Sequence, residues 1–557
     1  MPQPAVDVLI VGAGPTGLAL AAQLQRFGTR YRIVDVSLDG VHESRALGIQ
    51  ARTLECLDAI GVADVLVARG RTSTRVVMHE GARSIANIQF DDIDGLDTRY
   101  PFILLLSQAD TEQVLTDHLT SAGATIERGT ELVSFTAGDA DVECVLRKAG
   151  GIEDRVRAKY IVGCDGAHSI VRRSTGVAFE GGSYPQTFAL GDVEASGPLE
   201  PGAVNAFAGT GGMAMFFPLG RPTTWRVIAI SADLAEDRRG DDGAANSELL
   251  LADLQALVDR PTEGTVRLRD PAWLTRFHLH HRQVAHYRMG RVFLAGDAAH
   301  IHSPVGAQGM NTGIQDAWNL GWKLALVTRG AASDALLDTY ESERWPVGRF
   351  LLRYTDRLFG TVTRALSPGR VLSWVREFVV PRILPVIVKS SWPRSSVFRF
   401  VSELAIRYGP SMVVEEGTPR LRRGPRAGAR LPDSRLTLNG EPAALQRAAA
   451  GARATLILCG DTSAWNDVHV RSLCDQMGDL IGITYVSRVA SPDVLCDDGS
   501  TLALLGAENG AQYLVRPDGY IAYRAAGYDL TGLHRFVERM FVARSGAPAE
   551  ATPHATL

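Results

Sequence analysis

Hydrophobic residues open the chain as two short β-rich runs separated by a helical pattern. Residues 6–11 (VDVLIV) form an apolar run typical of a buried strand, and residues 31–36 (YRIVDV) form a second one. Between them, an alanine- and leucine-rich stretch extends with helical spacing to Phe27. A glycine-rich segment, residues 12–17 (GAGPTG), precedes this stretch. The pattern predicts a strand, a glycine turn, a helix and a second strand.

The glycines of this turn have separate predicted roles. Gly12 permits the tight turn, Gly14 lets a pyrophosphate approach the backbone, and Gly17 allows the helix to pack closely on the strand. Pro15 and Thr16 lie at the N-terminus of the predicted helix, whose exposed N–H groups and dipole attract an anion. These five residues form one predicted cofactor-binding site.

A carboxylate follows at the spacing that nucleotide-binding folds use. Asp35 lies near the end of the second strand, about 20 residues past the glycines, where it would accept hydrogen bonds from an adenosine ribose. Together with the strands and the helix, it predicts a dinucleotide site without distinguishing FAD from NAD. Only one GxGxxG segment occurs in the chain, so a nicotinamide cofactor is expected to bind transiently.

Apolar runs farther along the chain predict two more sheets. Residues 213–219 and 225–230 are typical of a β-hairpin around a Gly-Arg-Pro turn, within a β-rich stretch. A linker rich in Arg, Gly and Pro spans residues 417–432. Beyond it we predict strands and one helix in a thioredoxin-like order, at residues 454–459, 466–477 (the helix), 481–488 and 513–515.

Composition narrows the possible functions. The 557 residues are 45% hydrophobic and 22% charged, with a formal net charge of −4, which argues against disorder and against a nucleic-acid partner. At about 150 residues per domain, the length predicts several domains. The six cysteines are scattered without a CxxC pair, so we expect neither a metal site nor a dithiol centre. The C-terminal part is then expected to be structural or an oligomer contact, with a homodimer as the assembly considered.

The chain shows no targeting or membrane-spanning signal. It runs from Met1 directly into the first strand, so we expect a cytoplasmic protein. The apolar stretch at residues 378–388 is interrupted by prolines and an arginine and is shorter than the ~20 residues of a membrane span. For residues 371–406, a packed helix is favoured over an amphipathic helix at a membrane surface.

Three later segments resemble the flavin-dependent aromatic hydroxylases of the para-hydroxybenzoate hydroxylase and phenol hydroxylase type. They are residues 160–172 (YIVGCDGAHSIVR), 291–300 (RVFLAGDAAH) and 303–324 (SPVGAQGMNTGIQDAWNLGWKL). In this family they serve, in turn, FAD with nicotinamide, the ribityl hydroxyls, and the isoalloxazine ring. The chain departs mildly from the family at Ser303-Pro304 and at Gly306-Ala307, where two prolines and two glycines are more usual.

The resemblance implies a set of cofactor contacts. Pro304, Gly309 and Asn311 would position the flavin face, and no general acid or base is identified. The sheet that covers the active site in these enzymes makes Met215, Phe217 and Trp225 the candidate substrate contacts. The implied FAD contacts are Arg45, Gln108, Asp165, Gly296, Asp297, Pro304, Gly306, Gly309, Met310 and Asn311.

The resemblance also implies the reaction. We expect a single-component monooxygenase that uses FAD, NADPH or NADH, and O2 to hydroxylate a phenolic or polycyclic aromatic molecule through a flavin C4a-hydroperoxide. The alternatives are a Baeyer–Villiger, epoxidising or drug-inactivating flavin monooxygenase acting on a non-phenolic substrate, and a flavin-binding protein without catalysis. A flavin halogenase is disfavoured because its Trp-x-Trp-x-Ile-Pro segment is missing.

The predicted fold class is α/β. It combines a discontinuous Rossmann-like FAD-binding domain with an inserted β-sheet substrate domain and a C-terminal thioredoxin-like domain without CxxC. The FAD-binding domain takes residues 1–75, 100–182 and 285–345, and the substrate domain takes 76–99 and 183–284. A helical segment (346–416) and the linker (417–432) precede the thioredoxin-like domain (433–557).

Overall fold

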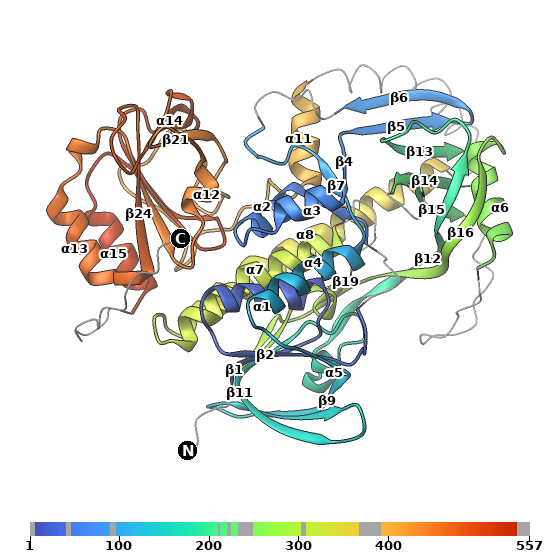
Figure 1. The fold of residues 1–557 in the computed structure, drawn as a ribbon, viewed down its shortest axis with the longest axis horizontal. Helices are drawn as coiled ribbons and strands as arrows, with labels where there is room; N and C mark the ends of the chain where they lie inside the picture. The colour runs from blue at the N-terminus through green and yellow to red at the C-terminus, as the bar shows by residue number, and fades with distance from the viewer. Residues whose placement is uncertain are drawn as a thin grey trace. The chain divides into compact units, whose positions relative to one another are not determined.

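The structure is a computed structural model of the chain (Figure 1). It describes residues 6–40, 46–89, 96–209, 212–219, 224–231, 249–301, 308–366 and 391–542. The chain divides into two compact units. The first comprises residues 1–321 and 340–406, and the second comprises residues 322–339 and 407–557.

The first unit is built around a mixed sheet whose centre is parallel. β1 runs parallel to β2 and β11, and β11 runs parallel to β18. All six residues of β1 are buried, as expected for a strand flanked on both sides. The strand order is β17 (Arg288–Met289), β18 (Val292–Leu294), β11 (Glu153–Gly163), β1 (Val6–Val11), β2 (Tyr31–Asp35) and β8 (Ile126–Arg128), with β10 (Val142–Lys148) joining β11 to β9 (Thr130–Ala137).

Helices and a small sheet surround this sheet. Helix α1 follows β1 directly, and its buried residues are alanine, leucine and glycine apart from Gln23, which permits close packing. The helices are α1 (Pro15–Arg26), α2 (Ala51–Asp58), α3 (Ala63–Arg69), α4 (Gln108–Ser121), α5 (Ile170–Thr175), α7 (Gly309–Thr328), α8 (Ala335–Leu366) and α11 (Ser391–Val401). The small sheet has the order β3 (Gly48–Ile49), β7 (Ile103–Leu105) and β4 (Arg71–Ser73).

A second sheet of the first unit takes its strands from two separate stretches of chain. Helix α6 (Leu251–Thr262) covers one of its faces (Figure 1), where Phe207, Phe216 and Leu254 are fully buried. The other face carries partly buried apolar side chains. The strand order is β19 (His300–Ile301), β16 (Arg267–Val284), β12 (Phe179–Ser196), β15 (Trp225–Ser231), β14 (Gly212–Pro218), β13 (Val204–Gly209), β5 (Arg75–Glu80) and β6 (Arg83–Gln89).

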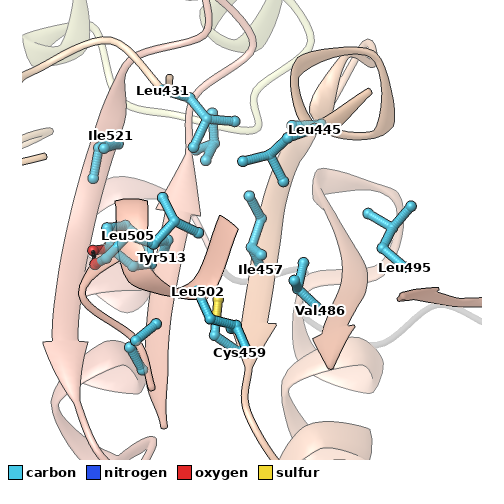
Figure 2. Close-up of a cluster of buried hydrophobic side chains, with 14 of the residues drawn as sticks. Leu431, Leu445, Ile457, Cys459, Val486, Leu495, Leu502, Leu505, Tyr513 and Ile521 are labelled. Carbon is cyan, nitrogen blue, oxygen red and sulfur yellow. Dashed lines mark hydrogen bonds between the residues drawn. The ribbon is translucent and has the colours of Figure 1, made fainter. Parts of the chain in front are cut away.

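The second unit holds a third sheet with its own core. Its strand order is β20 (Glu415–Glu416), β27 (Ile521–Ala526), β26 (Ala511–Val515), β23 (Ala454–Cys459), β24 (Ile481–Ser487), β25 (Val494–Cys496), β21 (Arg435–Leu438) and β22 (Glu441–Ala444). The helices described in this unit are α12 (Leu445–Ala449), α13 (Asp467–Met477), α14 (Ser500–Leu505) and α15 (Thr531–Met540), together with the end of α7 and the start of α8. Figure 2 shows Cys459 among the apolar side chains of this core, where burial raises the pKa of its thiol.

Candidate active site

The ends of four parallel strands bring the predicted cofactor segments together at one edge of the first sheet. Val11 of β1 pairs with Val34 of β2 and with Gly163 of β11, which in turn pairs with Leu294 of β18. Because the strands are parallel, the segments that follow them meet at the same edge, where open α/β sheets bind ligands. The glycine turn, the end of β2 and the turns after β11 and β18 therefore lie together.

The glycines of the first turn have the backbone conformations and contacts that their predicted roles require. Gly12 has φ +103°, and a Cβ atom there would lie 2.4 Å from the carbonyl oxygen of Cys164. A Cβ atom at Gly17 would lie 1.9 Å from the carbonyl oxygen of Gly12, so only glycine lets α1 approach the turn this closely. At Gly14 the nearest atom would be Glu112 Oε1, 4.0 Å away. Gly14 thus leaves open space for a ligand at the N-terminus of α1.

Asp35 holds the glycine turn in place. Its Oδ2 accepts a hydrogen bond from the Ala13 N–H (2.6 Å), and its Oδ1 accepts one from the Ser37 N–H (2.8 Å). The guanidinium of Arg128 lies 3.6 Å from the same carboxylate. Sequence reasoning assigned Asp35 to the ribose alone, whereas the structure gives it a role in shaping the turn as well.

Thr16 is the point at which three distant segments touch. A Cβ atom added to Gly296 would lie 2.5 Å from Thr16 Oγ1, and one added to Gly313 would lie 2.4 Å from the same oxygen. A Cβ atom at Gly313 would also lie 3.2 Å from the Cα of Gly296. The start of α1, the turn after β18 and the first turns of α7 are therefore packed against one another through small residues.

The turn after β18 exposes one carboxylate and anchors its backbone. Asp297 is exposed within the short 3-10 turn Gly296–Ala298. The Arg172 guanidinium donates to the carbonyl oxygen of Ala298 (3.1 Å) and lies 4.0 Å from the ring centre of Phe179. Sequence reasoning quoted Arg172 at the end of its motif but gave it no role. The structure makes it the link between α5 and this turn.

Asp165 binds the N-terminus of α5 with one carboxylate oxygen, and its other oxygen has no hydrogen-bond partner among the described residues. Its Oδ2 accepts hydrogen bonds from the backbone N–H groups of Ile170 (2.7 Å) and Val171 (3.3 Å). Its Oδ1 is buried and has no hydrogen-bond partner among the described residues. Burial raises the pKa of this carboxyl. An orphaned acceptor at the ligand edge of the sheet is consistent with a hydrogen-bonding ligand there.

Asp316 is the centre of a buried polar cluster that sequence reasoning missed. Its Oδ2 accepts from the Gly296 N–H (3.1 Å) and lies 2.6 Å from His300 Nε2, and its Oδ1 accepts from Arg344 Nε (2.7 Å). Arg344 also donates to the carbonyl oxygen of Thr312 (3.1 Å). The carboxylate thus joins the turn after β18, β19 and α8 to α7. The available signal was that Asp316 is the one acidic residue in α7.

Asn311 fixes the first turn of α7 to β3. Its side-chain amide donates to the carbonyl oxygen of Gly48 (2.8 Å), and its Oδ1 accepts from the Gln50 N–H (2.8 Å). The side chain is fully buried. Met310 and Gly309 beside it are partly exposed, and a Cβ atom at Gly309 would meet no atom of the described residues within 4 Å. The first turn of α7 is therefore held against β3 by the Asn311 side chain.

Gln108 lies at the first position of α4, next to the glycine turn. Its side-chain amide donates to Glu112 Oε1 (2.9 Å), and its backbone N–H donates to the carbonyl oxygen of Ala46 (3.2 Å). Ser107 caps the helix by accepting from the Asp110 N–H (3.0 Å). The amide side chain thus lies on the same side of the sheet edge as Gly14, whose nearest neighbour is also Glu112.

The three predicted substrate contacts do not lie on one face of the second sheet. Met215 and Phe217 are partly buried on the face that packs against Leu47 and Leu105. Trp225 lies on the opposite face: its ring is 5% exposed and packs with Phe216 in the core beneath α6.

An ion pair occupies the same face as Phe217. Arg226 pairs directly with Phe217 across the two strands, and its Nε and Nη2 donate to both oxygens of Asp192 (2.7 and 2.8 Å). Arg226 also donates to the carbonyl oxygen of Ala46 (3.3 Å), the atom that accepts from Gln108. The second sheet and the start of α4 are therefore joined through a single backbone carbonyl.

Three predicted contacts, Arg45, Pro304 and Gly306, lie outside the described residues. The same holds for residues 378–388. Within the described ranges, no group of three His, Cys, Asp or Glu side chains is arranged to hold a metal ion. No described helix is both long and apolar enough to cross a membrane.

Two family models match the chain. Residues 5–355 match the family described as FAD binding domain, and residues 424–543 match the one described as aromatic-ring hydroxylase, C-terminal. The first match covers more than half of the chain and contains each of the cofactor segments described above. The second covers most of the third sheet.

Curated and solved proteins are similar over nearly the full length. The chain is 35% identical over 530 residues to 6-methylpretetramide 4-monooxygenase of Streptomyces rimosus, covering 93% of this chain and 90% of that protein. The crystal structure of CabE, an aromatic hydroxylase from angucycline biosynthesis, matches with a TM-score of 0.74 and 30% identity, covering 97% and 99% of the two chains. Aklavinone-11 hydroxylase in complex with FAD and aklavinone matches with a TM-score of 0.76 and 27% identity, covering 97% and 99%.

Proposed function

The chain belongs to the FAD-dependent aromatic-ring hydroxylases and is an FAD-dependent monooxygenase, and from that premise we propose that it hydroxylates a phenolic polycyclic molecule with O2 and NADPH or NADH. We also assign its first sheet to a Rossmann-like domain and its second unit to a thioredoxin-like domain. The observation that carries the proposal is the packing of Thr16 against Gly296 and Gly313. This packing brings together the start of α1, the turn after β18 and the first turns of α7, which are the segments proposed to contact FAD.

Each part of the cofactor has residues suited to hold it. The open space at Gly14 and the N-terminus of α1 would bind the pyrophosphate, with Asp35 toward the ribose. The exposed Asp297 would accept from the ribityl hydroxyls. The N-terminus of α7 at Gly309 would direct its N–H groups and positive dipole to the ring.

When bound, FAD would supply the electron transfer and the oxygen activation. The protein residues position the ring, exclude water and stabilise charge. Asn311 keeps the start of α7 against β3, so the N–H groups aimed at the ring stay in place. Pro304, Gly306 and Arg45 remain proposed cofactor contacts on the strength of the sequence resemblance.

The substrate is proposed to lie between the flavin ring and the Met215–Phe217 face of the second sheet. This face combines apolar side chains with the Asp192–Arg226 ion pair, which suits a large aromatic molecule that carries polar substituents. The relatives named for 6-methylpretetramide and aklavinone act on or hold polycyclic compounds of this kind, which supports the size that we propose.

Neighbouring phenylalanines of β14 give a matched test of this face. We expect Phe217→Ala to lower the melting temperature much less than Phe216→Ala does, because Phe217 is only partly buried, and to raise KM for the aromatic substrate about tenfold, because one buried aromatic contact contributes roughly 1.5 kcal/mol or more. Phe216→Ala should instead cost about 3–5 kcal/mol of stability, because its ring is fully buried beneath α6. Thermal denaturation and steady-state kinetics check both. Equal effects on stability would show that the two faces are misassigned.

Coupling of cofactor oxidation to substrate binding tests the reaction itself. We expect NADPH oxidation by the FAD-loaded protein to rise severalfold when a polycyclic phenol that it hydroxylates is added. The physical reason is that a substrate which fills the Met215–Phe217 face changes the environment of the flavin edge that receives hydride. The measurement is NADPH absorbance across a panel of phenols. Identical rates with and without every substrate that is converted would contradict the coupling.

A further inference from the structure

Glu403 is a buried carboxyl that the proposed reaction does not use. It follows α11 with a left-handed backbone (φ +60°), and its side chain is 2% exposed. Its carboxyl accepts hydrogen bonds from the Thr312 hydroxyl (3.3 Å) and from the Gln315 side-chain amide. Both partners lie in the first two turns of α7, the helix whose N-terminus is proposed to face the flavin.

The charged side chains around Glu403 form ion pairs with one another. Asp316 of α7 is bonded to Arg344 of α8, and Arg52 of α2 lies 3.0 Å from Glu55. Among the described residues, Glu403 has no cation within ion-pair distance, and both of its hydrogen-bond donors are neutral. It is therefore the carboxyl of this cluster whose charge can change without breaking an ion pair.

The environment sets Glu403 to change its charge near neutral pH. Burial raises the pKa of its carboxyl to about 7; Arg344 opposes this rise and Asp316 adds to it. His300 also belongs to this cluster and bonds to Asp316. Around pH 7 the carboxyl is thus divided between its protonated and ionised forms, and a modest change in the local field decides between them.

Reduction of FAD at the start of α7 would be such a change. A hydride brings two electrons and one proton, so reduced FAD carries one more negative charge than the oxidised form. At an effective dielectric constant of ~20, a unit charge about 10 Å away changes a protonation equilibrium by roughly tenfold. An added negative charge near α7 therefore favours the protonated form of Glu403.

We propose that Glu403 takes up a fraction of a proton from solvent when FAD is reduced and releases it when FAD is reoxidised, which partly balances the charge at the N-terminus of α7. Protons and electrons balance over the cycle, since the carboxylate returns to its starting form. This inference rests on the proposed function, because it requires FAD at the start of α7. Glu403 is thereby a positioning and charge-balancing residue and does not touch the substrate.

The test compares the FAD-loaded full chain with its Glu403→Gln variant. The midpoint potential is measured as a function of pH, which counts the protons taken up per two electrons. In the wild type we expect more than one proton around and just above pH 7, and in E403Q we expect one. The infrared difference spectrum of reduced minus oxidised protein should contain a carboxylic-acid band that E403Q lacks. Glu131→Gln, at an exposed carboxylate of the same unit, should behave as the wild type.

Each outcome supports or overturns the inference. A wild type that takes up one proton and shows no carboxylic-acid band overturns it, even if E403Q fails to fold. The same holds if E403Q keeps the wild-type proton count. In both cases the visible spectrum of bound FAD and the hydroxylation of substrate would be intact, so the proposed function would stand. A chain that takes up no FAD would overturn both.

Discussion

Replacement of Asp316 by asparagine is expected to destabilise the protein by about 3–5 kcal/mol and to abolish stable FAD binding. The carboxylate is fully buried between Arg344 and His300, so its removal leaves buried charge without compensation. Asparagine also has only one acceptor oxygen, so it cannot accept both from Arg344 and from the Gly296 N–H of the turn that is proposed to hold the ribityl chain. Chemical denaturation and FAD titration measure the two effects.

A surface pair supplies the control for this substitution. Asp64→Asn removes a carboxylate that pairs with Arg99 at 3.1 Å but is 61% exposed, and we expect it to cost less than about 1 kcal/mol. If D316N and D64N lost similar stability, or if D316N bound FAD normally, the buried cluster would not be what supports the cofactor turn.

The Asp316 cluster also predicts a pH dependence of stability. Burial by itself would raise the pKa of Asp316, but Arg344 and His300 outweigh it and lower the pKa below the usual value of 3.8. A carboxyl whose pKa is depressed by folding contributes stability above its unfolded pKa and loses it as the pH falls through the folded value. The wild type should therefore lose stability below about pH 4 more steeply than D316N.

Alanine at two glycines of the first turn is expected to separate folding from cofactor binding. Gly17→Ala places a methyl group 1.9 Å from the Gly12 carbonyl oxygen, so α1 must shift, and both stability and FAD affinity should fall. Gly14→Ala places its methyl group in open space, so the melting temperature of the apoprotein should hardly change. Its FAD affinity should nevertheless fall about 10- to 100-fold, because the pyrophosphate can no longer approach the backbone.

Two possible results for these variants would contradict the roles assigned to Gly14 and Gly17. If Gly14→Ala left the dissociation constant of FAD unchanged, the dinucleotide would not pass over this glycine. If Gly17→Ala left both stability and affinity unchanged, the close contact of α1 with the turn would carry no energetic weight. Fluorescence quenching of FAD and thermal denaturation of the apoprotein distinguish these results.

The sequence predicted the local structure of the first strand, turn and helix because its signals are local. The strand, the glycine turn and the helix follow one another within residues 6–27, and each glycine conformation is dictated by its immediate neighbours. The roles foreseen for Gly12 and Gly17 match their observed contacts. Alternation along β14 also made Met215 and Phe217 share one face of their strand.

The features of the site that the sequence did not predict depend on contacts between residues far apart in the chain. The sequence did not show that Trp225 lies on the opposite face from Met215 and Phe217, because its side depends on the hairpin register, which pairs it with Pro218. No local pattern shows that Glu403 meets Gln315, since the two are 88 positions apart. Arg344 likewise lies 28 residues beyond Asp316. Buried polar clusters of this kind are fixed by tertiary packing, which periodicity and composition do not encode.

The central claim is that this chain inserts one oxygen atom of O2 into an aromatic substrate with the help of FAD. The most direct test is the mass of the product that the FAD-loaded protein forms from a polycyclic phenol with NADPH under isotopically labelled dioxygen. The account predicts a product that carries a single labelled oxygen atom. A protein that binds FAD and oxidises NADPH, yet yields only peroxide or incorporates its oxygen from water for every phenol tested, would contradict it.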